Sequence, residues 1–481
     1  MHHTEFRKAA HRVADLMADY LWRLESFRVL PDISPGDVLG ELPPAPPQGP
    51  ESLDSILEDY GKLIEPNITH WQHPAFLAYF SSVATGPGIL GEMLAATLNS
   101  NVMFWQNAPA STELEQLIVS WLRQMLGLPG DFDGMLTDTA SISSLTSLVA
   151  ARHALAGLDA RDEGLAGRDG LGRLRLYCSE EAHSSIEKAA VVIGVGRAGV
   201  RRIPADDEYR MRVNLLREAI AEDRAAGWWP FCVVATLGTT STTSVDPVAA
   251  VADVCAREKL WLHVDAAYAG AAAILPEASS WFVGWERADS IVVNPHKWLF
   301  TPFDASLLLF RQPETYRQAF GLVPEYLKAT GDGARNYHEY GIQLGRRFRA
   351  LKLWMIIRYF GVEGIAARLR SHCEMARDLA ARVDDAPDWE RLAPVPFSTV
   401  CLRFRPRELA GREGEDGVRE RLDRWNAEIL DRVNREGKVY LSHSKAKGRY
   451  ALRVSIGNPR TTREHIELCW NELTSAAAQT S

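Results

Sequence analysis

Reactive side chains follow four apolar runs of this sequence, each within a few residues of the end of the run. They are His183 after residues 174–178, Thr240 after 231–236, Asp265 after 260–264, and Asn294, His296 and Lys297 after 290–293. A lysine amine can condense with an aldehyde, and a carboxylate can keep a nearby ring nitrogen protonated. An imidazole can stack on the face of a flat ring. This combination is what pyridoxal phosphate (PLP) requires of a protein.

The order of residues around Asp265 favours a flat ring with its nitrogen beside that carboxylate. A protonated pyridine ring is the electron sink for a carbanion, so its nitrogen needs a negative partner. Ala267 points the same way two residues further along an extended chain and leaves room for the ring. The phosphate should lie at a helix N-terminus, where free N–H groups and the dipole favour an anion. Residues 137–141 precede a helical pattern at 142–156, and Ser290 is a further candidate donor.

Each of these residues also has an ordinary structural explanation. A single aspartate after a strand is usually a turn or cap residue, a single lysine is usually a solvated charge, and a single histidine is usually a structural group. The joint placement in DAAYAG (265–270) and NPHKW (294–298) is what favours a cofactor site.

The apolar runs are short and alternate with helical patterns, which predicts an α/β domain built on a mostly parallel sheet. Strands are expected at 174–178, 200–203, 231–236, 260–264 and 290–293, and helices at 215–224 and 247–259. In such sheets ligands bind beyond the carboxyl ends of the strands. All four motifs lie at such ends.

The two ends of the chain have a different pattern. Residues 5–27 form an amphipathic helix pattern that the proline-rich segment 42–50 separates from the rest, so we expect this helix to pack on a partner chain. A helix from 344 to about 359 leads to a region with expected strands at 399–404 and 450–456 and helices at 417–436 and 462–473. The expected divisions are an N-terminal helical dimerisation segment (1–85), a large cofactor-binding domain (86–360) and a small α+β C-terminal domain (361–481).

Composition excludes several classes of protein. The formal net charge of -8 argues against a nucleic-acid binder, because such proteins neutralise phosphates with clustered basic residues. The six cysteines are scattered without CxxC spacing, which predicts reduced thiols, no metal site and a cytoplasmic location. The N-terminus lacks the apolar core of a signal peptide, and no apolar stretch of about 18 residues predicts a membrane span.

The motifs of this chain resemble those of the PLP-dependent group II amino-acid decarboxylases, in particular the aromatic-L-amino-acid decarboxylase branch. The similar segments are WQHPAFLAYF (71–80), STELEQ (111–116), AHSSIEKA (182–189), VATLGTTSTTSVD (234–246), WLHVDAAYAG (261–270), NPHKWLF (294–300) and LGRRFRALKLW (344–354). They extend over nearly the whole chain. Tyr268 and Trp298 resemble the aromatic branch more than the glutamate decarboxylase branch.

The resemblance implies a fold type I PLP enzyme and a homodimer with its active site at the subunit interface. It implies that Lys297 is the Schiff-base lysine, Asp265 the pyridinium partner and His183 the ring-stacking histidine. It further implies that Thr240, Ala267 and His296 line the cofactor, and that Ala140, Ser141 and Asn294 contact its phosphate. Tyr337 is placed at the family's catalytic-loop tyrosine, eight residues before Gly345. The segment 330–341 is polar and contains glycines, as expected of a mobile lid.

The substrate pocket departs from the family pattern. Trp71, Tyr79 and Phe80 are expected to form an aromatic wall, with Ser82, Asn101 and Met103 as further lining residues. Ser81-Ser82 stands where animal enzymes carry threonine, and Asn101 and Met103 replace apolar and aromatic residues contributed by the second subunit. The phosphate motif at 138–141 is not glycine-rich. The preference among tyrosine, dopa, tryptophan and phenylalanine therefore stays open.

The predicted reaction is decarboxylation of an aromatic L-amino acid to its amine and CO2 through a PLP aldimine and quinonoid, with Tyr337 protonating Cα. An aromatic aldehyde synthase and a transaminase are the alternatives on the same fold, and a scaffold without activity would be expected to lack the lysine or the aspartate. A GxGxxG match at 194–199 raises an NAD-dependent dehydrogenase as a remote alternative. A helical pattern precedes that match and no helix follows it, which favours a glycine turn ending a helix.

Overall fold

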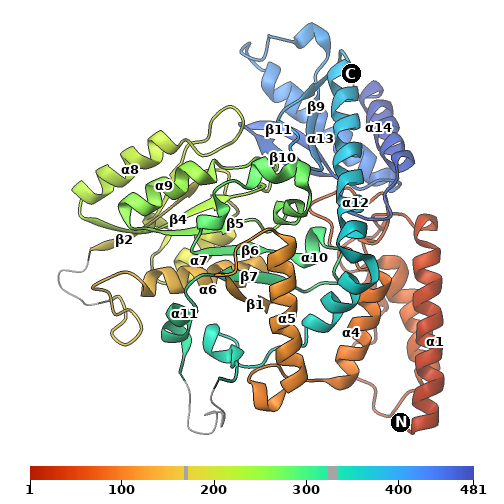
Figure 1. The fold of residues 1–481 in the computed structure, drawn as a ribbon. Coiled ribbons are helices and arrows are strands. Elements are labelled where there is room, and N and C mark those ends of the chain that lie inside the picture. Colours follow the sequence, from red (N-terminus) through yellow and green to blue (C-terminus); the bar gives the residue numbers. More distant parts are fainter. Residues whose placement is uncertain (167–171, 323–332, 481) are drawn as a thin grey trace. The chain divides into compact units, whose positions relative to one another are not determined.

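The computed structural model describes residues 1–166, 172–322 and 333–480 (Figure 1). The chain forms two compact units. The terminal unit comprises residues 1–81, 378–392 and 400–481, and the central unit comprises residues 82–377 and 393–399.

The central unit is built on a seven-stranded sheet with the order β1-β7-β6-β5-β4-β2-β3. The strands are β1 (Asp133–Thr137), β2 (Arg173–Ser179), β3 (Val200–Ile203), β4 (Trp228–Thr236), β5 (Trp261–Asp265), β6 (Ser290–Val293) and β7 (Ser306–Phe310). The neighbours from β3 to β6 pair in parallel, whereas β7 is antiparallel to both β6 and β1. The predicted α/β class with a mostly parallel sheet is confirmed.

Helices cover both faces of this sheet, which explains why every residue of the central strands β5 (Trp261–Asp265) and β6 (Ser290–Val293) is buried. Figure 1 shows α6 (Ala140–His153) and α7 (Ser185–Val192) on one face, with α8 (Val213–Ala225) and α9 (Val248–Glu258) on the other. Further helices of this unit are α4 (Gly86–Leu98), α5 (Pro109–Met125), α10 (Pro295–Trp298) and α11 (Pro313–Phe320).

The long helix α12 (Ala350–Asp385) begins six residues later than the sequence predicts and has a non-helical residue at Gly361. The predicted start at Leu344 is wrong because the backbone of Arg346 bonds to another segment. Its N–H donates to Asn101 Oδ1 at 2.9 Å, and its carbonyl accepts from the Val102 N–H at 2.9 Å. The carbonyl of Arg346 is therefore not available to accept from the N–H of residue 350, as an α-helix through this position would require.

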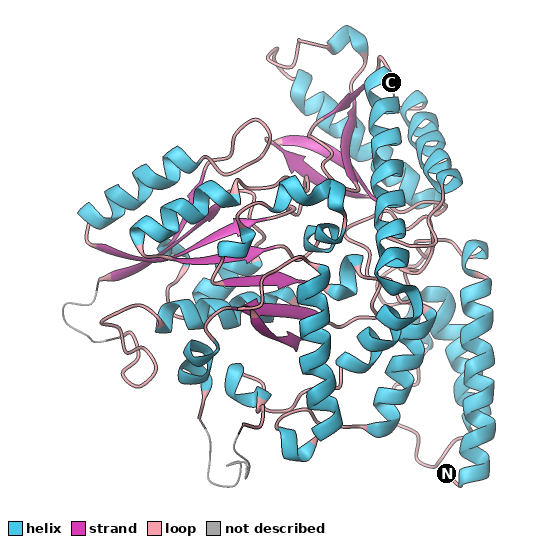
Figure 2. Cartoon of the chain, in the orientation of Figure 1, coloured by secondary structure: helices cyan, strands magenta, loops and turns pink. Residues whose placement is uncertain are grey.

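The terminal unit combines helices with a four-stranded sheet of order β10-β11-β9-β8, drawn with the other strands in Figure 2. Its strands are β8 (Trp389–Arg391), β9 (Thr399–Phe404), β10 (Ser442–Ala446) and β11 (Arg449–Ser455). Its helices are α1 (His3–Trp22), α2 (Asp37–Glu41), α3 (Leu53–Asp59), α13 (Val418–Glu436) and α14 (Arg463–Ala478). The predicted small α+β C-terminal region is present.

The GxGxxG match lies where a helix ends, as predicted. Helix α7 stops at Val192, and the Val195 and Gly196 N–H groups both donate to the Ala190 carbonyl, at 2.9 and 3.0 Å. Gly194 and Gly196 adopt positive φ of 81° and 71°, which glycine adopts without strain. No helix opens at Gly199, so this segment is not a dinucleotide-binding turn.

No helix among the described residues is long and apolar enough to cross a membrane. Within the same part of the chain, no group of histidine, cysteine and acidic side chains is arranged to hold a metal ion. All six cysteines are buried free thiols.

Candidate active site

Backbone hydrogen bonds align the carboxyl ends of β4, β5 and β6. The Leu237 N–H after β4 donates to the Asp265 carbonyl at 2.9 Å, and the Ala266 N–H after β5 donates to the Val292 carbonyl at 3.0 Å. The Asn294 N–H then donates to the Ala267 carbonyl at 2.9 Å. Three of the four predicted motifs therefore meet at one edge of the sheet.

Asp265 is the last residue of β5 and is only 6% exposed. Its Oδ1 accepts a hydrogen bond from the Ala267 N–H at 3.1 Å. A buried carboxylate is costly unless a cation or further donors face it. A protonated ring nitrogen would supply both.

His183 and Lys297 lie within electrostatic reach of Asp265. Desolvation lowers the pKa of His183 most, the charge of Asp265 opposes this shift, and the charge of Lys297 adds to it. The Nδ1 of His183 accepts from the Ser185 N–H at 3.2 Å and contacts the Ser185 hydroxyl at 2.8 Å, which places its proton on Nε2 in the neutral form. The structure thus brings together the three residues on which the sequence prediction depends.

His296 and Asn294 complete the cofactor edge, the name used here for His183, Thr236, Asp265, Asn294, His296 and Lys297. His296 is buried, and burial together with the charge of Lys297 lowers its pKa to about 3. Its Nδ1 accepts from the Ala305 N–H at 3.0 Å, so the neutral ring carries its proton on Nε2 and can donate from there.

The predicted phosphate contacts Ala140 and Ser141 form the first turn of α6, whose N-cap is Thr139. First-turn N–H groups have no partner within their own helix and face outward with the positive end of the dipole. Asp138 just before this turn is engaged locally: its carboxylate accepts from the Thr139 N–H at 2.6 Å and from Gln343 Nε2 at 3.1 Å. Ser290 lies at the opposite, amino end of β6, so its suggested role as a phosphate donor is wrong.

The residues of this edge fit a bound cofactor. Asn294 Oδ1 and Thr236 Oγ1 are buried without a hydrogen-bond partner, although buried polar atoms are nearly always paired in native proteins. Gly238 after β4 has a φ of +91°, and a Cβ there would lie 2.5 Å from the Cβ of Ala269. The two unpartnered polar atoms leave hydrogen-bonding capacity for a bound PLP at this edge, and the close contact of Gly238 with Ala269 fixes the turn after β4.

Two buried residues support this edge although the sequence analysis assigned them no role. Asp246 accepts from the Thr236 N–H at 2.8 Å and from the Met211 N–H at 2.7 Å, which fixes the loop carrying Thr240. Burial raises the pKa of Asp246 to about 6. His263 lies on β5, two residues before Asp265. Asp246 and His263 both lie inside motifs quoted above, and this position is the only signal of their role in the sequence. An acid at the end of VATLGTTSTTSVD, or a histidine inside a strand, has no distinctive pattern of its own.

The predicted aromatic wall belongs to the terminal unit, whereas the cofactor edge belongs to the central unit. Trp71 and Tyr79 are exposed and stacked, with ring centroids 5.9 Å apart. Phe80 lies beneath the guanidinium of Arg453 at 4.4 Å. The three aromatic side chains thus lie on one short segment, and their contact with substrate stays a prediction.

The remaining predicted substrate residues lie in the central unit. Asn101 is exposed, and its Nδ2 lies 3.6 Å from the sulfur of the half-buried Met103. The Met103 carbonyl accepts from the His338 N–H at 3.0 Å, and Ser82 is half-buried. The segment 101–103 is therefore held against residues 338–346 of its own chain.

Tyr337 does not lie on an open lid. It begins a short 3-10 turn (Tyr337–Tyr340), is 1% exposed, and packs beneath the guanidinium groups of Arg346 at 4.4 Å and Arg335 at 5.0 Å. Burial raises the pKa of Tyr337 well above its ordinary value. Residues 333–341 are packed against the rest of the central unit in this structure, residues 330–332 lie outside the described part of the chain, and the mobile lid stays a prediction.

Arg346 organises a buried cluster with Glu115 and Tyr337, called here the Arg346 brace. The Arg346 guanidinium donates to Glu115 Oε1 at 2.5 Å and to the carbonyls of Leu136 and Val102 at 2.6 and 3.0 Å. Glu115 also accepts from the Leu136 N–H at 2.8 Å. The brace therefore anchors β1, the strand that leads to the phosphate turn.

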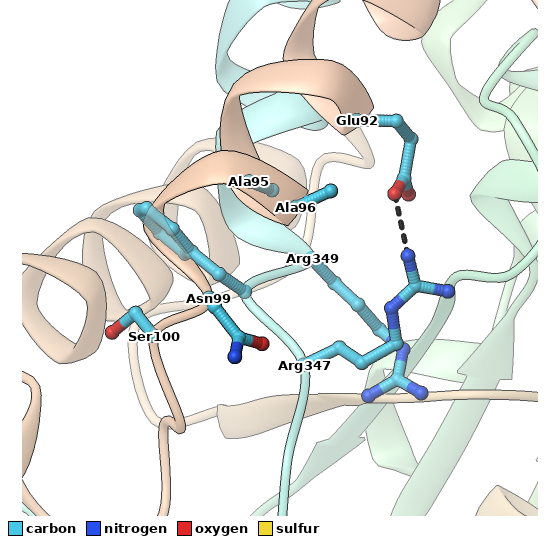
Figure 3. A pocket seen from close by; sticks show the side chains of 8 residues that line it. Glu92, Ala95, Ala96, Asn99, Ser100, Arg347 and Arg349 are labelled. Carbon is cyan, nitrogen blue, oxygen red and sulfur yellow. Dashed lines mark hydrogen bonds and ion pairs between the residues drawn. The ribbon is translucent and has the colours of Figure 1, made fainter. Parts of the chain in front are cut away.

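A separate pocket lies where α4 ends (Figure 3). It is lined by Glu92, Ala95, Ala96, Asn99, Ser100, Arg347, Phe348 and Arg349. Arg347 reaches across to Glu92 at 2.7 Å. None of the predicted cofactor or substrate residues lines this pocket, so it is not the predicted active site.

Comparison with known proteins identifies the family. Residues 35–405 match the pyridoxal-dependent decarboxylase conserved domain. The chain is 38% identical to the aromatic-L-amino-acid decarboxylase of Sus scrofa, over 100% of this chain and 97% of the pig protein. It is 36% identical to the phenylacetaldehyde synthase of Arabidopsis thaliana, over 98% and 96% of the two chains.

A solved structure extends the likeness to the fold. The Oryza sativa TDC crystallised with PLP and tryptamine superposes with a TM-score of 0.93 at 36% identity, covering 100% of this chain and 99% of the rice chain. The fold is therefore that of fold type I PLP decarboxylases, and PLP is the cofactor that fits the cofactor edge. The chain belongs to the group II PLP-dependent decarboxylases and is a carboxy-lyase of the aromatic amino-acid decarboxylase type.

Proposed function

We propose that this protein decarboxylates an aromatic L-amino acid to the corresponding amine and CO2. One observation carries the proposal: His183, Asp265 and Lys297 lie within electrostatic reach of one another at one edge of the sheet. The names of the relatives support an aromatic substrate, since they include decarboxylases of tyrosine and tryptophan.

Each predicted cofactor residue has a proposed task. Bound PLP supplies the electron sink that makes loss of a carboxylate possible. The Lys297 amine holds the cofactor covalently, and the Asp265 carboxylate keeps a positive charge on the ring nitrogen. His183, neutral because its pKa is lowered, lies against the ring. The first turn of α6, with Ala140 and Ser141, and the side-chain amide of Asn294 bind the phosphate, while Thr240, Ala267 and His296 line the cofactor.

Retention of both His183 and Tyr337 favours the amine over the aldehyde as product. The relatives include both decarboxylases and an aldehyde synthase, so the family alone does not decide between them. A panel of tyrosine, dopa, tryptophan and phenylalanine, analysed for CO2, amine, aldehyde and peroxide, tests the proposal. One mole of amine per mole of CO2 is expected. Aldehyde with peroxide would indicate a synthase, and a keto acid would indicate a transaminase.

The proton donor to Cα needs a separate test. The resemblance predicts this role for Tyr337, but the burial of Tyr337 in the Arg346 brace counts against it. Tyr326, outside the described residues, is the matched comparison. If Tyr337 is the donor, Tyr337→Phe diverts product from amine to aldehyde and Tyr326→Phe does not. The reverse result would remove Tyr337 from the mechanism.

We also propose that the protein is a homodimer, with Asn101 and Met103 contributing to the partner's pocket. Helix α4 exposes an apolar stripe at helical spacing, formed by Leu90, Met93, Leu94 and Leu98. Helix α1 has no buried residue, and Trp22 at its end is 90% exposed. Exposed apolar stripes such as that of α4 mark protein interfaces.

Light scattering tests the dimer. The expected molar mass is twice the 53.5 kDa of one chain. Leu94→Glu should produce monomers, whereas Val283→Glu, a charge at another exposed apolar position, should not. A wild-type monomer would contradict the proposal. A cytoplasmic location stays a proposal that rests on the six free thiols.

A further inference from the structure

His263 is a completely buried histidine that uses both of its ring nitrogens. It lies in the middle of β5 with 0% exposure. Its Nδ1 lies 2.9 Å from the Ser290 hydroxyl, and its Nε2 lies 3.1 Å from the Ser144 hydroxyl. Ser144 belongs to α6 and Ser290 to β6, so one side chain connects three elements.

The partners of His263 are themselves buried and engaged. Ser144 and Ser290 are both 0% exposed. The Trp261 indole N–H donates to the Ser290 hydroxyl at 2.9 Å. Because indole only donates, Ser290 must accept from it, and its single proton remains for one other partner. A shift of α6 against the sheet would therefore stretch or break the hydrogen bond between His263 and Ser144.

The three connected elements carry the residues at both ends of the proposed PLP site, the phosphate end and the ring end. Helix α6 begins with Ala140 and Ser141, the proposed phosphate contacts. Strand β6 leads directly to Asn294 and Lys297. On β5 itself, side chains two residues apart project from the same face of a sheet, so His263 lies on the face of Asp265.

We propose that His263 is a positioning residue that sets the spacing between the phosphate end and the ring-nitrogen end of the PLP site. A rigid aromatic phosphate has a fixed length, so the first turn of α6 and the Asp265 carboxylate must be held at a matching separation. The inference rests on the proposed roles of Asp265 and of residues 140–141.

The charge state of His263 fits this role. Burial lowers the pKa of His263 to about 4, and the nearby charge of Asp265 only partly opposes this shift. His263 is therefore neutral at neutral pH. A cation at this position would compete with the ring nitrogen for the carboxylate of Asp265, and a neutral imidazole does not.

Three substitutions separate the two hydrogen bonds. His263→Asn keeps a polar group near the position of Nδ1 and thus the bond to Ser290, whereas His263→Gln reaches the position of Nε2 and the bond to Ser144. His263→Leu removes both bonds. The matched control is Tyr177→Phe, which removes a buried bond of 2.9 Å to Asp223 from strand β2. That bond touches neither α6 nor Asp265.

The readouts are the PLP dissociation constant, the visible absorbance of bound PLP, and thermal unfolding of the protein without PLP. We expect His263→Leu to weaken PLP binding about tenfold or more and to alter the absorbance, with smaller changes in His263→Asn and His263→Gln. Tyr177→Phe should lower the unfolding temperature with PLP affinity and absorbance unchanged.

Wild-type PLP affinity and absorbance in His263→Leu would overturn the proposal, and so would equal loss of affinity in Tyr177→Phe. If His263→Leu does not fold, the same criteria apply to His263→Gln and His263→Asn. Failure of the proposed function is a different result: the wild-type protein would then bind PLP without releasing CO2 from any aromatic amino acid.

Discussion

The cofactor edge and the Arg346 brace are both clusters of polar and charged groups in the central unit, yet their hydrogen bonding differs. In the brace, the Arg346 guanidinium donates to a carboxylate and two carbonyls and covers an aromatic ring. At the cofactor edge, Asn294 Oδ1 and Thr236 Oγ1 are buried without partners. A satisfied cluster stabilises the fold, and an incomplete one is prepared for a ligand.

Breaking the brace should have the largest effect on stability. Glu115→Ala leaves the buried Arg346 without its counter-ion, which costs about 3–5 kcal/mol of unfolding free energy. Denaturant unfolding measures this change. The absorbance of bound PLP in the protein that remains folded should match the wild type. A loss below about 1 kcal/mol, typical of exposed ion pairs, would show that the brace is not a buried ion pair in solution.

Breaking the cofactor edge should instead affect catalysis. Asp265→Ala removes the charge facing the ring nitrogen and should lower kcat about 10²–10³-fold, the scale of one preorganised electrostatic contact. Its unfolding free energy in the absence of PLP should change little or rise, because a buried carboxylate is removed. Steady-state kinetics at saturating PLP measure the first effect. Activity within a few-fold of the wild type would remove Asp265 from its proposed role.

Acidification should destabilise the central unit through two of its buried histidines. The folded-state pKa values of His263 and His296, about 4 and about 3, lie below the usual value near 6.5. Their contribution to stability is therefore present above about pH 6.5 and is lost as the pH falls towards 4, at about 1.4 kcal/mol per pH unit for each residue. The pKa of Asp246 is raised to about 6, so its contribution to stability grows as the pH falls. Between about pH 6 and 4 this gain offsets the loss from one of the two histidines.

Denaturant unfolding of the PLP-free protein at a series of pH values tests this balance. In His263→Leu the unfolding free energy should fall less steeply on acidification than in the wild type. The difference in slope should be about 1.4 kcal/mol per pH unit, the contribution of one titrating histidine. An unchanged slope would mean that His263 titrates normally in the folded protein.

The smallest effect should come from the hydroxyl at the end of β4. Thr236→Val removes no hydrogen bond from the PLP-free protein, because Thr236 Oγ1 has no partner there, so stability should change by less than about 1 kcal/mol or rise. The matched variant Thr137→Val removes a bond of 2.7 Å to Ser143 and should be destabilised by about 1 kcal/mol. Equal losses in the two variants would contradict the difference in hydrogen bonding.

The bounds of helices and strands could be predicted best where a single hydrophobic pattern dominates the local sequence. Strands at 290–293 and 399–404 have the predicted bounds, because both runs are short, contain β-branched residues and are bounded by polar or turn residues. Strand β1, which contains Gly134, and strand β7, an apolar SLLLF run, were not predicted. Short apolar runs of this kind do not distinguish a buried strand from a helix.

Tertiary contacts account for the errors at the site. Local composition predicts a helix start at Leu344 and gives no sign that Tyr337 is buried. Arg346 instead bonds to residues more than 200 positions earlier in the chain, and its guanidinium encloses Tyr337. His263 was read only as part of a strand, since its bonds to Ser144 and Ser290 have no signal in the local sequence.

The central claim is that Lys297 carries the cofactor with Asp265 beside the ring nitrogen. Reduction of the PLP-loaded protein with borohydride, followed by peptide mass spectrometry, tests it most directly. The expected result is one stable pyridoxyl adduct per chain on the peptide containing Lys297, absent in Lys297→Ala. An unmodified Lys297 peptide from a protein saturated with PLP, or an adduct on another lysine, would contradict it.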